Sequence, residues 1–255
     1  MKVVIIGTGN TATALGRLIK QSGYSVLQVC GRTTEATRTL AESLDAAYAT
    51  SMKAIDPNGD LYLMAVSDDA IATIAGQFSF HTKLLVHTAG SVSIDILKEA
   101  SRNYGVLYPL QSLRKEAGSL PVIPFLVDGN TGDDLTLLYD FAQTLSPLVQ
   151  KAGDAVRKKY HLAAVLVNNF SNHLYSLAKD FCAGTQTDFN LLLPLIQQLP
   201  PRLNDYSPQE LQTGPAIRND QVTIDTHLTL LKDYPEIKNL YALFTKGIQE
   251  YYRRK

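Results

Sequence analysis

The stretch that decides the fold lies near the start of the chain and reads Val3-Val4-Ile5-Ile6-Gly7-Thr8-Gly9-Asn10-Thr11-Ala12. Its opening run of apolar, β-branched residues is typical of a strand that is buried on both faces. Two glycines end this run, and a helical pattern over residues 11–21 follows them. A strand, a tight glycine turn and a helix in this order predict the first unit of a parallel α/β sheet.

The same alternation continues to about residue 150. Further apolar runs predict strands at residues 25–30, 61–66, 84–88, 105–107 and 125–128. Helical patterns separate most of them, at residues 34–44, 70–77, 94–103 and 133–145. Strands that alternate with helices indicate a parallel sheet with helices on both faces, as in a Rossmann fold.

The pattern changes after Asp154. Residues 154–183 contain neither proline nor glycine and keep helical spacing throughout, and further helical patterns follow at 189–199, 221–231 and 235–252. The helical pattern at residues 189–199 stops at Pro200-Pro201. No strand pattern occurs in this half. The fold class is therefore α/β, with a doubly wound parallel sheet at residues 1–150 and an all-α domain at residues 151–255.

The composition excludes several classes of partner. Lysine plus arginine equals aspartate plus glutamate, at 24 residues each, so no net charge draws the protein to nucleic acid or to an anionic membrane. Cys30 and Cys182 match no metal-binding or redox spacing, which favours reduced thiols. The apolar run before Gly7 is too short for a signal peptide, and no later stretch reaches membrane-span length. We expect a cytoplasmic protein.

Gly7, Gly9 and Ala12 match the pattern G-x-G-x-x-[G/A], with Thr8, Asn10 and Thr11 between them. The first glycine permits a tight turn, and the second lets the backbone approach a pyrophosphate. The following helix offers free N–H groups and a favourable dipole to the phosphates. The motif predicts a bound dinucleotide, and the alternative is a glycine turn without a ligand.

The end of the second predicted strand indicates which dinucleotide is bound. NAD-binding chains usually place an acidic residue there to bind the ribose 2′-hydroxyl. Here the run is Val29-Cys30-Gly31-Arg32-Thr33-Thr34. Arg32, with the hydroxyls of Thr33 and Thr34, suits a 2′-phosphate, so we predict NADP as the cofactor. The alternative is that Arg32 is a solvated surface residue.

Four segments together resemble a known group of proteins. They are the glycine motif from Gly7 to Ala12, Gly31-Arg32-Thr33, Val66-Ser67-Asp68-Asp69 after a predicted strand and His87-Thr88-Ala89-Gly90-Ser91 after another. They resemble the 6-phosphogluconate-dehydrogenase-like superfamily, which includes pyrroline-5-carboxylate reductases, β-hydroxyacid dehydrogenases and deazaflavin-dependent NADP oxidoreductases.

Two further segments narrow the resemblance. Tyr108-Pro109-Leu110-Gln111-Ser112 and residues 211–220, which read LQTGPAIRND, resemble a branch that joins such a Rossmann domain to a helical domain of unknown function. The resemblance implies that Val66, Ser67 and Asp68 lie under the adenosine and pyrophosphate. It also implies that His87, Thr88, Ala89, Gly90 and Pro109 lie near the nicotinamide.

One departure concerns the catalytic lysine. β-Hydroxyacid dehydrogenases carry it on the long helix in a run like K-L-V-N-N, whereas this chain reads Val165-Leu166-Val167-Asn168-Asn169. Val165 thus replaces the usual proton donor to a reduced carbonyl, which argues against ordinary β-hydroxyacid dehydrogenase chemistry.

Candidate catalytic residues lie on the long helix. Offsets of four, seven and eleven residues put His161, Val165, Asn168 and Asn172 on one face of a regular α-helix. This stripe either binds a polar substrate, with His161 as general acid, or bonds across a helix–helix or dimer interface.

Three residues outside that stripe are further candidates. Thr213 precedes a Gly-Pro turn, and Arg218 just after it either binds a carboxylate or phosphate or pairs with Asp220. Tyr108, at a strand end, either donates a proton or packs. We predict no metal site, because Asp220 and His227 lack a third ligand.

The leading hypothesis is an NADP-dependent oxidoreductase that acts on a small polar carbonyl or imine compound in a crevice between the domains. The alternative is an NADP(H)-binding sensor or regulatory protein without turnover, which Val165 favours. A long apolar helix needs a partner surface, so we expect a homodimer formed through the helical domain.

Overall fold

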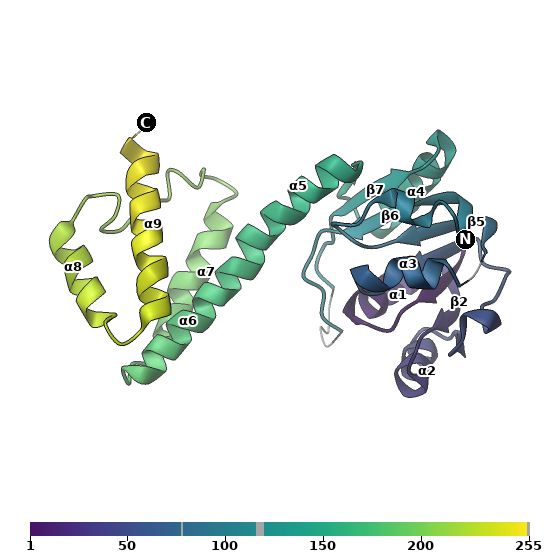
Figure 1. Cartoon of the computed structure of the whole chain (residues 1–255), viewed down its shortest axis with the longest axis horizontal. Helices are drawn as coiled ribbons and strands as arrows, with labels where there is room; N and C mark the ends of the chain where they lie inside the picture. Colours follow the sequence, from purple (N-terminus) through teal and green to yellow (C-terminus); the bar gives the residue numbers. More distant parts are fainter. Residues whose placement is uncertain (78, 116–119, 254–255) are drawn as a thin grey trace. The chain divides into compact units, whose positions relative to one another are not determined.

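The computed structural model describes residues 1–77, 79–115 and 120–253. The chain forms two compact units, Met1–Asn169 and Phe170–Lys255 (Figure 1). The first unit therefore contains the start of the long helix as well as the sheet.

The first unit is built on an eight-stranded sheet of order β3-β2-β1-β4-β5-β6-β7-β8. Its strands are β1 (Lys2–Ile6), β2 (Ser25–Cys30), β3 (Ala47–Ala49), β4 (Leu61–Met64), β5 (His81–His87), β6 (Ser101–Pro109), β7 (Phe125–Gly129) and β8 (Val149–Lys151). The chain leaves β1 toward β2 and β3 on one side and returns to β4, β5 and β6 on the other. This reversal puts the topological switch point, where such sheets bind ligands, between β1 and β4.

Two apolar cores cover the two faces of the sheet. On one face the core includes Leu15 of α1 (Asn10–Gln21), Leu40 of α2 (Thr34–Ser43) and Phe141 of α4 (Gly132–Leu145). On the other it includes Ile71 of α3 (Ile71–Ala75) and Leu97 of the 3₁₀ turn η3 (Ile94–Leu97). Two further 3₁₀ turns, η1 (Met52–Ala54) and η2 (Asp68–Ala70), precede β4 and α3. The predicted doubly wound architecture is confirmed.

Some local predictions were wrong. The helix predicted over residues 94–103 is only the 3₁₀ turn Ile94–Leu97, because Ser101 already begins β6 and pairs with His81 of β5. β3 and β8 are three residues long and gave no pattern in the sequence. β7 runs antiparallel to β6, which makes the sheet mostly rather than wholly parallel.

The long helix has three parts, which are α5 (Asp154–Ala164), a π-helical segment (Val165–Phe170) and α6 (Ser171–Gly184). π-Helical turns have i→i+5 hydrogen bonds and occur frequently at functional sites. The segment breaks the regular α-helical spacing on which the shared face of His161, Asn168 and Asn172 was predicted. It also contains the boundary between the two units.

In the second unit the described residues are helical or irregular. After α6 come η5 (Phe189–Leu192), α7 (Leu193–Arg202), α8 (Gln221–Leu230) and α9 (Pro235–Arg253). The predicted stop at Pro200-Pro201 was wrong by one or two residues. The carbonyls of both prolines still accept hydrogen bonds from the N–H groups of Leu203 and Asn204, so the turn continues past them. Within the described part of the chain, no helix has both the length and the hydropathy to cross a membrane.

Candidate functional site

A cavity of about 920 Å³ lies at the carboxyl ends of β1, β2 and β4, at the switch point of the sheet. Nine of the residues predicted to bind the cofactor line it, and these are Gly7, Thr8, Gly9, Asn10, Thr11, Arg32, Thr33, Val66 and Ser67. Three separate segments of the sequence thus meet at one hollow, because the carboxyl ends of neighbouring parallel strands lie at the same edge of the sheet.

The glycine loop has the geometry that a pyrophosphate requires. Gly7 has φ +126°, and a Cβ atom there would collide with the carbonyl oxygen of Ala65. Gly9 is the N-cap of α1 and provides no side-chain cap, and a Cβ atom there would meet nothing within 4 Å. The first N–H groups of α1 are therefore open to a ligand on the cavity side, which fits a bound dinucleotide phosphate.

The corner of the cavity beyond β2 carries Arg32 and Thr33, both exposed. Thr50, Ser51 and Met52, which directly follow β3, line the same cavity. These three residues were not among the candidates from the sequence, because β3 is too short to show a periodic pattern. A guanidinium with hydroxyl groups nearby fits the extra 2′-phosphate of NADP.

The remaining residues predicted for the cofactor do not line the cavity. Ala12 is fully buried and packs in the core. Six more lie outside the lining, and these are Asp68, His87, Thr88, Ala89, Gly90 and Pro109. They follow β4, β5 and β6, or end those strands, and so lie at the same edge of the sheet as the cavity.

His87 is fully buried, and its Nδ1 accepts a hydrogen bond from the N–H of Ala89 (3.1 Å). Burial, and to a lesser extent the positive charge of Arg157, lower the pKa of His87 to about 4. The imidazole is therefore neutral at physiological pH, and it acts as a core residue rather than as a proton donor.

Tyr108 and His161, two of the predicted catalytic residues, form a hydrogen-bonded pair. The hydroxyl of Tyr108, in β6, lies 3.0 Å from Nδ1 of His161, in α5, and the two rings meet edge to face. Gly90 lies directly against both, because a Cβ atom there would come within 2.8 Å of His161 Nδ1 and of Tyr108 Cζ. Only a residue without a side chain allows the two rings to approach this loop so closely.

Burial and the nearby carboxylate of Asp68 raise the pKa of the Tyr108 phenol, while Arg157 opposes them. Asp68 itself accepts a hydrogen bond from the Ser91 hydroxyl (2.6 Å), which ties the loop after β4 to the loop after β5. The phenol therefore keeps its proton at neutral pH, and its oxygen can either donate to Nδ1 of the neutral ring or accept from Nδ1–H of the protonated ring.

The other catalytic candidates lie elsewhere. Asn168 is exposed in the π-helical segment of the first unit, whereas Asn172, Thr213 and Arg218 are exposed in the second. In that second unit Asp220 caps α8 and accepts hydrogen bonds from the N–H and the hydroxyl of Thr223. These bonds, and more weakly the charge of Arg218, lower the pKa of Asp220.

His227, considered with Asp220 as a pair of metal ligands, instead shares a hydrogen bond with another side chain. Its Nδ1 lies 2.8 Å from the hydroxyl of Tyr241. Among the described residues, no three histidine, cysteine or acidic side chains gather closely enough to hold a metal ion.

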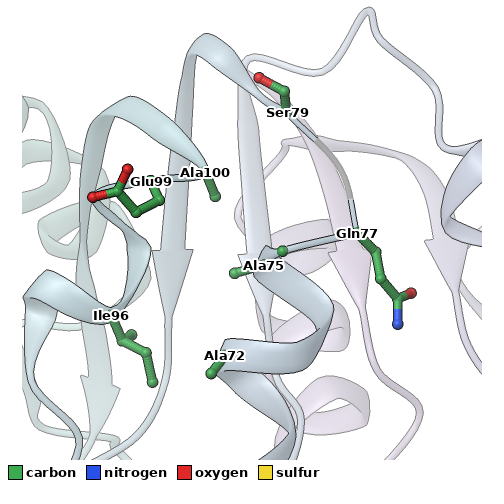
Figure 2. A pocket seen from close by; sticks show the side chains of 8 residues that line it. Ala72, Ala75, Gln77, Ser79, Ile96, Glu99 and Ala100 are labelled. Atoms are coloured by element: carbon green, nitrogen blue, oxygen red, sulfur yellow. The ribbon is translucent and has the colours of Figure 1, made fainter.

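A second hollow, of about 440 Å³, lies between α3 and η3 (Figure 2). Small side chains dominate its described lining, including Ala72, Ala75 and Ala100, and Glu99 is its one charged residue. The segments that line it lead into the amino ends of β5 and β6, opposite the edge where such sheets bind ligands. Of the two cavities, the larger one therefore lies at the edge of the sheet where such folds bind ligands.

Two family models match the chain. Residues 2–91 match the domain described as NADP oxidoreductase coenzyme F420-dependent, and residues 123–248 match the domain of unknown function DUF2520. No curated protein matches the chain.

Several solved structures have the same fold. A protein of Bacteroides fragilis with the provisional name of an NADP oxidoreductase is 36% identical, covers 98% of both chains and superposes with a TM-score of 0.89. A pyrroline-5-carboxylate reductase of Streptococcus pyogenes is 16% identical, covers 98% of both chains and has a TM-score of 0.64. A reductive aminase of Aspergillus terreus, solved with NADPH and ethyl-5-oxohexanoate, is 17% identical, covers 98% of this chain and 94% of its own, and has a TM-score of 0.72.

The narrower resemblance found in the sequence and the predicted NADP cofactor are both confirmed, whereas the wider superfamily stays a prediction. This chain belongs to the family that joins an NADP oxidoreductase domain to a C-terminal DUF2520 domain, and its cofactor is NADP.

Proposed function

We propose that this protein transfers hydride between NADP(H) and the carbon of a C=O or C=N group in a small polar compound. Bound NADPH supplies the hydride. In the reducing direction the oxygen or nitrogen of the substrate also needs a proton, and His161 is the group that we propose to supply it. Imidazole is the side chain best suited to give and take protons near neutral pH.

The Tyr108–His161 pair is the observation that carries this proposal. It lies at the carboxyl ends of β5 and β6, strands that continue the sheet outward from the cofactor cavity at β1 and β4. The bond with Tyr108 occupies Nδ1, so Nε2 is the nitrogen that would face the substrate. Tyr108 thus orients the ring. When the imidazolium gives its Nε2 proton to the substrate, Nδ1–H can donate to the Tyr108 oxygen, as it does to the third member of a catalytic triad.

The Tyr108–His161 pair could also compensate for the missing lysine. β-Hydroxyacid dehydrogenases carry that lysine where this chain has Val165. His161 precedes Val165, the first residue of the π-helical segment, by four residues or about one helical turn, and could deliver a proton in place of the missing amine. Asn168, Asn172, Thr213 and Arg218 remain our proposed substrate-binding residues, with Arg218 suited to a carboxylate or phosphate group.

We also propose that the protein is a homodimer formed through its helical unit. Many large apolar side chains of that unit are exposed, among them Leu191, Leu195, Val222 and Leu243, each more than 60% accessible. Exposed apolar surface on this scale marks an interaction site. Two copies of the unit would cover it with the same residues on each side.

Turnover tests the proposal most directly. NADPH oxidation, followed by absorbance, would be screened against 2-oxo acids, aldehydes and cyclic imines. With a substrate found, we expect His161→Gln to lower kcat by about 10²- to 10⁴-fold, which is the usual contribution of a general acid. Tyr108→Phe, which leaves the imidazole but removes its partner, should cause a smaller loss.

His173→Gln is the matched control, because His173 is an exposed histidine on α6 outside the proposed site. Equal activity of His161→Gln and His173→Gln would contradict the role of His161. Tight NADPH binding without turnover of any compound in the three classes would favour the alternative, a sensor of NADP(H). The valine at position 165 is the observation that supports this alternative.

A further inference from the structure

Arg157 is the most deeply buried charged residue among those that the structure describes. It lies in the first turn of α5, its side chain is fully inaccessible, and its Nη2 donates to Oδ1 of Asp154 at 2.6 Å. Within the described part of the chain, Nε and Nη1 have no hydrogen-bond partner. Apolar residues often stabilise a fold as well as a buried ion pair does, so stability gives little reason to keep a cation here.

The contacts of Arg157 and Asp154 converge on one loop. Nη2 of Arg157 donates a second hydrogen bond to the carbonyl of Val92 (2.5 Å). Oδ1 of Asp154 accepts one from the N–H of Ile94 (3.1 Å). The ion pair therefore holds the backbone at two points, at Val92 in the loop after β5 and at Ile94, where η3 begins, and it fixes the first turn of α5 against this segment.

The same loop carries Gly90, against which the Tyr108–His161 pair is packed. His161 follows Arg157 by four residues, so the two side chains lie on the same face of α5, one turn apart. Helix α5 thus contacts this segment at two places. The Arg157–Asp154 pair contacts residues 92–94, and the imidazole of His161 contacts Gly90. A shift of the first turn of α5 along the loop would move the ring of His161 by the same amount.

The charge of Arg157 also acts on three titratable groups in the first unit. Its guanidinium contributes to the low pKa of His87, and it partly offsets the burial and the Asp68 carboxylate that raise the pKa of Tyr108. It also counters the burial that raises the pKa of Asp128, in β7. The guanidinium of Arg157 therefore opposes the rise in the pKa of the Tyr108 phenol and also holds the loop at Val92.

We infer that Arg157 and Asp154 are positioning residues, which hold the loop at Val92 and Ile94 so that His161 stays within hydrogen-bonding distance of Tyr108. This inference rests on the proposed function, because the pair matters only if it delivers the proton. A side chain near a reacting group must be held within about half an ångström of its working position, and neighbouring residues that do not touch the substrate supply that precision. Arg157 and Asp154 are neighbours of this kind.

The test measures the coupling between Tyr108 and His161 without any enzyme assay. In protein labelled with ¹³C at histidine, the ring signal of His161 is identified by its loss in His161→Gln. Tyr108→Phe should displace this signal in the otherwise unchanged protein. In an Arg157→Met background we expect the displacement to be about threefold smaller or absent, because contacting residues lose their coupling when their support is removed.

Two further variants make the result decisive. Arg38→Met is the control, because Arg38 pairs with Glu42 on the exposed side of α2, and the displacement should stay at its full size. If Arg157→Met does not fold, Arg157→Lys replaces it. Lysine keeps the charge but loses the planar guanidinium, so we expect the displacement to fall by about half.

The inference would be overturned if Tyr108→Phe displaced the His161 signal by its full amount in a folded Arg157→Met or Arg157→Lys protein. With a substrate found, Arg157→Met should also lower kcat about tenfold or more while the KM for NADPH stays the same. A roughly tenfold rise of the KM for NADPH with no change in kcat would likewise overturn the inference. If the protein turns over no substrate, the proposed function fails, whereas the NMR experiment still decides whether Arg157 positions His161.

Discussion

The buried imidazole of His87 makes the stability of the sheet unit depend on pH. The pKa of His87 is about 4 in the folded protein, mainly through burial and partly through the charge of Arg157, against 6.5 for an ordinary histidine. In the unfolded chain the same ring takes up a proton near pH 6.5. Between these two values the unfolded state binds more protons, so the free energy of unfolding falls as the pH falls.

The size of the effect follows from the two pKa values. One pKa unit corresponds to about 1.36 kcal/mol, so a difference of about 2.5 units costs roughly 3 kcal/mol once the pH is below 4. At pH 5 the loss relative to pH 7 is about 2 kcal/mol, a large share of the stability of a typical domain.

Native-state hydrogen exchange of the β5 amides measures this free energy in the sheet unit alone, which matters because the two units need not unfold together. Compared with the unchanged protein, His87→Asn should have lower stability at pH 7 but should lose about 2 kcal/mol less between pH 7 and pH 5. His173→Asn, a change of an exposed histidine, should keep the full dependence on pH. Parallel losses in the His87→Asn variant and the unchanged protein would refute the reasoning.

Three more predictions concern the Tyr108–His161 pair, the cofactor and the proposed dimer. Gly90→Ala places a Cβ atom 2.8 Å from His161 Nδ1 and should lower the free energy of unfolding by about 1–3 kcal/mol, measured with urea, as well as turnover. Arg32→Asp should weaken NADPH binding far more than NADH binding in fluorescence titrations, because it sets a carboxylate against the 2′-phosphate. Leu195→Glu, on an exposed position of α7, should shift the protein from dimer to monomer in light scattering at micromolar concentration.

Each of these has its own control or contrary result. Gly132→Ala is the control for Gly90→Ala, since a Cβ atom at Gly132 meets nothing within 4 Å, and its stability should not fall. Equal weakening of NADPH and NADH by Arg32→Asp would show that Arg32 does not read the 2′-phosphate. A protein that is monomeric before any substitution would contradict the proposed dimer.

Much of the lining of the larger cavity, our candidate cofactor site, could be predicted from the sequence because its parts are local. The phosphate loop is one contiguous run from Gly7 to Ala12, and its chemistry depends on a turn and on the helix that follows directly. Arg32 and Thr33 likewise follow the second strand, where an acidic residue would indicate NAD. Neighbours in the chain interact whatever the rest of the fold does, so their pattern already predicts NADP.

What only the tertiary structure decided depends on residues that are far apart in the chain. Tyr108 and His161 were separate candidates 53 residues apart, and only the packing of α5 beside β6 brings them together over Gly90. Thr50 to Met52 reach the cavity through β3, a strand too short to give a pattern but stabilised by pairing with β2. The sequence also does not reveal that Arg157 holds the loop after β5. A buried arginine and an exposed one are the same residue in a sequence, and only the fold excludes water from one of them.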